Sequence, residues 1–77
     1  MALAILLITA VPGKDREVAN EVKKVKGVEK AFLVSGLYDV VARVQGANTE
    51  EILATVYDKI RPIPGVKSSQ TMFVLEV

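Results

Sequence analysis

Residues 30–45 read KAFLVSGLYDVVARVQ, and this stretch decides the fold. Two runs within it, 30–34 and 38–45, have the apolar, β-branched and aromatic composition of strands. Only Ser35, Gly36 and Leu37 separate them. So short a gap allows nothing but a hairpin, and the two strands are therefore predicted to be antiparallel neighbours.

Helical patterns flank this hairpin on both sides. Upstream, apolar residues recur at the helical period and charged residues occupy the opposite stripe. Downstream, Asn48 or Thr49 can cap a second helix, and Pro62 predicts its end near Ile60. The predicted order is a strand at 3–11, a helix at 15–25, strands at 30–34 and 38–45, a helix from about 48 to 60, and a strand at 69–77.

The two halves of the chain repeat one pattern of strand, loop, helix and strand. Lys26-Gly27-Val28 in the first half matches Pro64-Gly65-Val66 in the second, and each triplet precedes a strand. Right-handed crossovers leave room for a third strand between the two parallel strands of each half. We therefore expect one α+β domain over residues 1–77, with a ferredoxin-like βαββαβ order, a four-stranded antiparallel sheet and both helices on one face.

The sheet face away from the helices is predicted to be bare and apolar. In the third and last strands both alternating sets carry apolar residues, so Val41, Met72 and Val74 or their alternates face outward. Such a patch exceeds what monomers usually expose, and a homodimer would bury it. The alternative is a mixed surface with a few isolated valines.

Composition removes most catalytic and metal chemistry. The chain has 10 Lys and Arg against 9 Asp and Glu, a net charge of +1, so it offers no strong attraction for nucleic acid. It has no Cys and no His, and thus no thiolate, imidazole or usual zinc ligand. We expect no metal, no cofactor and no enzyme, although Tyr38, Asp39, Arg43 or a lysine alone could serve general acid or base chemistry.

The same elimination places the protein in the cytoplasm and away from membranes. The apolar run at residues 2–11 is too short to span a bilayer, and no Lys or Arg precedes it as in a signal peptide. Absence of cysteine fits a reducing compartment.

The hairpin places a phenol and a carboxylate at its mouth. Asp39 is an acceptor when ionised and could hold an ammonium group, with Tyr38 beside it. The alternative is purely structural: Gly36 supplies a positive φ for the turn, Tyr38 packs its ring, and Asp39 caps local backbone amides.

Residues 35–40, 64–66 and 69–75 together resemble the effector-binding RAM domain of Lrp/AsnC, or feast/famine, transcriptional regulators. The resemblance covers almost the whole chain and implies dimers of the αβ-barrel type formed sheet to sheet. It also implies rings of dimers that bind amino acids between them. Carried over residue by residue, it places the effector pocket at Gly36, Tyr38, Asp39, Ser69 and Thr71.

The sequence departs from the family at two points. Ser35 and Ser69 stand where the family often has Thr, which affects pocket shape and effector choice. The helix-turn-helix domain that precedes this module in full regulators is absent, so direct DNA binding is not expected.

The resemblance implies a stand-alone domain that senses an amino acid, co-assembles with full-length regulators, or both. A purely structural oligomer without a ligand is one alternative. A small dimeric αβ-barrel enzyme, which would need a deep cleft between helices and sheet, is the other.

Overall fold

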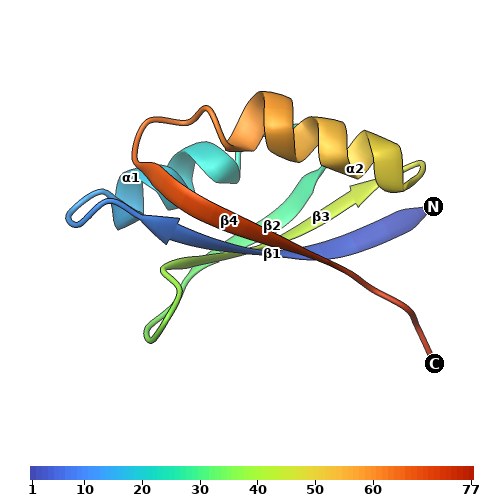
Figure 1. Cartoon of the computed structure of the whole chain (residues 1–77), viewed down its shortest axis with the longest axis horizontal. Helices are drawn as coiled ribbons and strands as arrows, with labels where there is room; N and C mark the ends of the chain where they lie inside the picture. The colour runs from blue at the N-terminus through green and yellow to red at the C-terminus, as the bar shows by residue number, and fades with distance from the viewer.

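The structure is a computed structural model that describes residues 1–77, and it confirms the ferredoxin-like βαββαβ order. Figure 1 shows both helices on the same side of the sheet. The elements are β1 (Ala2–Ala10), α1 (Asp15–Val22), β2 (Val28–Leu33), β3 (Val40–Gly46), α2 (Thr49–Thr55), a π-helical turn η1 (Val56–Ile60) and β4 (Val66–Phe73).

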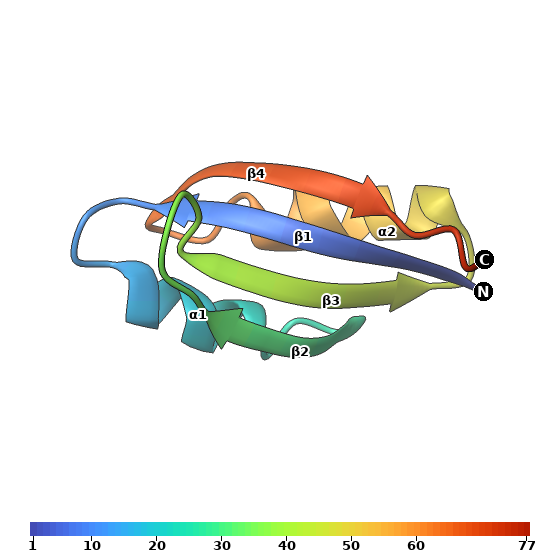
Figure 2. The ribbon, with the colours of Figure 1, turned by 90° about the horizontal axis from the view of Figure 1, so that it is seen from below.

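The sheet has the strand order β2-β3-β1-β4, which Figure 2 shows from the face without helices. β1 pairs with β3 and with β4, and β3 pairs with β2, all antiparallel. β3 therefore lies between the parallel strands β1 and β2, and β1 lies between β3 and β4. This is the interlocked arrangement that the right-handed crossovers predict.

Strand register decides which apolar set lies under the helices. Leu6 pairs with Ala42 and Ile8 with Val40, and all four side chains are fully buried. The core contains only apolar residues: Ala4, Leu6, Ile8, Ala10, Val18, Ala19, Val22, Val40, Ala42, Val44, Ile52, Val56 and Ile60.

The predicted internal repeat is confirmed at the two loops that enter β2 and β4. Gly27 and Gly65 both have a φ of +99°, a conformation that favours glycine. The backbone amide of Gln45 donates to Gly27 O at 2.8 Å, and that of Val11 donates to Gly65 O at 2.8 Å. In each half, the same turn is therefore hydrogen-bonded to the end of another strand, β3 at Gly27 and β1 at Gly65.

The prediction for the last strand was wrong at both ends. β4 covers Val66–Phe73 instead of 69–77, because a bulge in β4 at Lys67 lets the pairing continue from Ser68, opposite Thr9, to Val66, opposite Ala10. At the other end, Val74 still donates to Leu3 O at 3.0 Å. No residue after Val74 is hydrogen-bonded to β1, and the last residues leave the sheet.

The helices depart from the sequence patterns at two places, the end of α1 and the residue before Pro62. α1 ends at Val22 instead of residue 25, as the chain tightens toward the turn at Gly27. α2 continues into η1 and ends at Ile60 as predicted. Arg61 nevertheless keeps helical dihedrals before Pro62, because its amide donates to Val56 O at 2.8 Å, a π-type bond.

Candidate functional site

The hairpin between β2 and β3 protrudes from the open face of the sheet at the end of β1, as Figures 1 and 2 show. Its connection covers residues 34–39, longer than the predicted 35–37, and is closed by a hydrogen bond of 2.9 Å from Val34 N to Asp39 O. Gly36 is exposed at φ +114°, so it supplies the positive φ that the sequence predicts for the turn.

Asp39 is bonded to the end of β1 through both backbone and side chain. Its amide donates to Ile8 O at 2.9 Å. Its Oδ2 accepts a hydrogen bond of 2.7 Å from the backbone amide of Ala10. The carboxylate thus caps a backbone amide, as the structural alternative predicts. Its other oxygen, Oδ1, takes no part in that bond.

Tyr38 reaches across β1 to β4. Its hydroxyl donates to Gln70 Oε1 at 3.1 Å, and Gln70 pairs with Leu7 in the sheet. Sequence reasoning did not include Gln70 in the site. Neighbouring strand residues face opposite sides of the sheet, so Gln70 faces the side opposite to Ser69 and Thr71. This alternation is the signal that could have placed Gln70 on the side over which Tyr38 extends.

Ser69 and Thr71 lie on the helix side of the sheet, apart from Tyr38. They pair with Ile8 and Leu6, whose side chains are buried beneath the helices, and each is half-buried on the edge strand β4. The five predicted pocket residues are therefore divided between two faces within one chain. The pocket itself stays a prediction.

The open face carries an apolar surface on its four strands. Ile5 and Leu7 are half-exposed, while Phe32 and Met72 are 52% and 40% exposed. Arg43, which pairs with Ile5 on the central strands, adds a charged group within this face and forms an ion pair with Glu29 at 3.0 Å. We define the open-face patch as Leu3, Ile5, Leu7, Phe32, Val41 and Met72, which alternate with the buried set along their strands.

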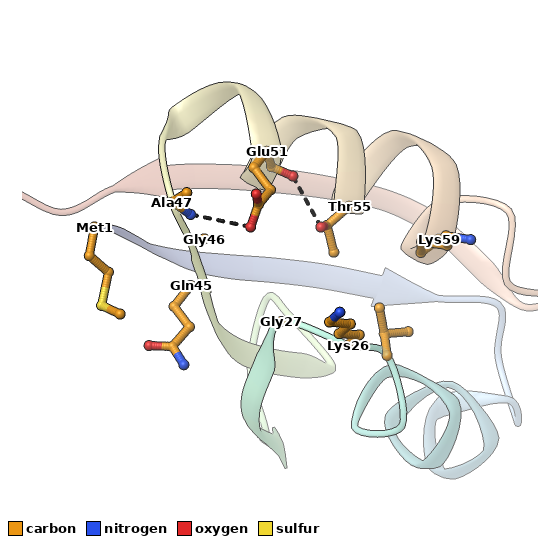
Figure 3. A pocket seen from close by; sticks show the side chains of 10 residues that line it. Met1, Lys26, Gly27, Gln45, Gly46, Ala47, Glu51, Thr55 and Lys59 are labelled. Atoms are coloured by element: carbon orange, nitrogen blue, oxygen red, sulfur yellow. Dashed lines mark hydrogen bonds between the residues drawn. The ribbon is translucent and has the colours of Figure 1, made fainter.

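A hollow of about 1080 Å³ lies at the opposite end of the sheet from the hairpin, between the loop that enters β2 and the helix α2 (Figure 3). Sequence reasoning missed it. The core between helices and sheet contains no buried polar or charged side chain. Neither helix has the length and apolarity needed to cross a membrane.

Fold and surface together define a small ferredoxin-like domain whose sheet is covered on one face only. A family model described as the Lrp/AsnC ligand binding domain matches residues 3–77. The chain belongs to that family.

Relatives with curated names and solved structures agree with this assignment. The transcriptional regulator FL11 of Pyrococcus abyssi is 38% identical over 74 residues, which are 96% of this chain and 48% of the regulator. The chain thus spans about half the length, or less, of the curated relatives it matches.

Two solved structures of comparable length share the fold. The protein FFRP-DM1 is 28% identical with a TM-score of 0.90, covering 97% of this chain and all 100% of that one. TTHA0845 from Thermus thermophilus is 25% identical with a TM-score of 0.93, covering 100% of this chain and 96% of that one.

Proposed function

We infer that this chain is an effector-sensing domain that binds an amino acid at an interface between copies and modulates transcription regulators by co-assembly. The observation that carries the proposal is the match of a ligand-binding family model to residues 3–77. The named relatives are transcriptional regulators, which supports a regulatory role over an enzymatic one.

The open-face patch supports the self-association that this proposal needs. Its residues are apolar, lie on adjacent strands of the face without helices, and are exposed or half-exposed in a single copy. A second copy packed sheet to sheet would remove them from water, at about 25 cal/mol for each Å² buried. Rings of such dimers, as the family resemblance implies, are the proposed larger assembly.

The division of the five predicted residues favours a pocket shared between copies. Tyr38 reaches over the open face, whereas Ser69 and Thr71 lie on the helix side of the edge strand β4. A contact between dimers can bring the hairpin of one copy to the edge strand of another. There, Asp39 would hold the ammonium group of the ligand and hydroxyls would hold its carboxylate.

Such a site would couple ligand to assembly. A ligand that binds only the completed pocket stabilises the oligomer that contains it, by mass action. If the chain co-assembles with a full-length regulator in the cytoplasm, the ligand-dependent change in assembly would alter how that regulator binds DNA. Direct DNA binding by these 77 residues is not part of the proposal, because the net charge is only +1.

A purely structural oligomer is the second candidate, favoured by a specific observation. Two polar side chains of the hairpin that were assigned to the pocket have partners within the chain: Asp39 accepts from Ala10, and Tyr38 donates to Gln70. On this alternative the hairpin needs no ligand to satisfy its polar groups.

Calorimetric titration with each of the twenty amino acids separates the two candidates. We expect heat from at least one amino acid with the wild-type protein. Removing the charge in Asp39→Asn should weaken that binding about tenfold to a hundredfold, the usual range for one charge-assisted hydrogen bond. Heat from none, or equal affinity in the variant, would leave the hairpin as a turn only.

A further inference from the structure

The hollow beside α2 has no part in the hairpin site, yet several of its lining residues are polar or charged. It lies between the loop that ends α1, the end of β3 and the helical segment that runs from α2 into η1 (Figure 3). Its lining is Met1, Val25, Lys26, Gly27, Gln45, Gly46, Ala47, Glu51, Thr55 and Lys59.

The hollow lies where the two halves of the internal repeat differ in how closely a helix packs against the glycine loop. In the second half, a Cβ built on Gly65 would meet side-chain atoms of Lys14 and Val18 at 3.0 Å, so helix α1 is pressed against that loop. In the first half, the nearest side chain to a Cβ on Gly27 is Thr55, at 3.9 Å. Helix α2 therefore stands farther from its glycine than α1 does, and space is left between them.

Opposite charges border this space without pairing with each other. Lys26 lies on the loop wall and Glu51 on the helix wall, and Figure 3 shows these two lining residues on opposite sides of the hollow. The ion pairs of the chain are elsewhere: Lys14–Glu17, Lys24–Glu21 and Arg43–Glu29.

Glu51 is also held in position before any ligand arrives. Its Oε1 accepts a hydrogen bond of 3.2 Å from Ala47 N, and its own amide donates to Asn48 Oδ1 at 2.8 Å. Oε2 is not used in these bonds. The hydroxyl of Thr55 donates to Glu51 O at 3.1 Å and keeps its lone pairs available on the same wall.

We propose that this hollow is a second binding site, for a zwitterionic amino acid whose carboxylate meets Lys26 and whose ammonium group meets Glu51. The lining also contains Lys59, so two lysines face one glutamate. A simple cation is repelled by both lysines, whereas a zwitterion can place its carboxylate beside a lysine and its ammonium group beside Glu51. Ligand pockets usually measure about 300 to 1000 Å³, so this hollow has room for any amino acid and charge is the main selector. The site does not depend on the hairpin.

Calorimetry on the full chain, with the twenty amino acids and with inorganic phosphate, tests this site. Lys26→Gln and Glu51→Gln are the test variants. Gln at 51 keeps an oxygen acceptor for Ala47 N, so the start of α2 is preserved. Lys67→Gln and Glu50→Gln are matched controls, since both side chains are exposed and neither lines the hollow.

We expect at least one amino acid to bind, with affinity falling about tenfold or more in each test variant and staying within about twofold in the controls. That site should survive in Asp39→Asn. No heat from any amino acid, or unchanged affinity in Lys26→Gln and Glu51→Gln, would overturn the proposal. Loss in Asp39→Asn alone would place the ligand at the hairpin, and equal binding of phosphate would show an anion site instead.

Discussion

The carboxylate of Asp39 and the backbone amide of Ala10 are joined by a hydrogen bond of 2.7 Å. This bond ties the base of the protruding hairpin to the end of β1, the central strand beneath it. The same side chain therefore has a structural partner and, in the proposed function, a ligand to hold with its remaining oxygen.

The bond predicts a graded loss of stability at this position. Asp39→Ala removes the acceptor and leaves the partly buried Ala10 amide without it, which should cost about 1.5 to 3 kcal/mol. Asp39→Asn keeps an acceptor and loses only the charge, so about half that loss is expected. Urea unfolding measures both; equal stability of wild type and Asp39→Ala would show that the bond contributes nothing.

Two glycines with a positive φ predict a difference that depends on packing. Gly13, at φ +85°, has no atom within 4 Å of the place where a Cβ would stand, so Gly13→Ala carries only the left-handed backbone cost of about 1 to 2 kcal/mol. Gly65→Ala adds contacts of 3.0 Å to Lys14 and Val18, and about 1 to 3 kcal/mol more from overpacking. Unfolding midpoints of the two variants should differ; identical midpoints would mean that α1 shifts freely.

The open-face patch predicts a specific loss of self-association. Val41→Lys puts an unpaired charge into the proposed apolar interface, which costs several kcal/mol and should raise the dimer dissociation constant at least about a hundredfold. Ala54→Lys, on the exposed side of α2, is the matched control. Sedimentation velocity measures both variants. An unchanged dimer in Val41→Lys would place the interface elsewhere.

Much of the fold is predictable because local signals agree with one another. The short gap at residues 35–37 specifies a hairpin, and the loops at Gly27 and Gly65 mark equivalent turns. The outward set of β1 was not predictable, because Leu3, Ile5 and Leu7 are as apolar as the alternate set and only strand pairing selects Leu6 and Ile8 for the core.

The candidate sites show where sequence reasoning stops. Ser69 and Thr71 were assigned to one pocket with Tyr38, but strand alternation and pairing to β1 place them on the other side of the sheet. The hollow at Gly27 was missed because it depends on the distance between a helix and a loop. Lys26 and Glu51 look like ordinary surface charges until that distance is known.

Native mass spectrometry of the chain, with and without a mixture of the twenty amino acids, tests the central claim most directly. We expect a dimer or a larger multiple of the 8.3 kDa chain, which retains bound amino acid and shifts toward larger assemblies when the mixture is present. A monomer of 8.3 kDa that carries no amino acid under either condition would contradict it.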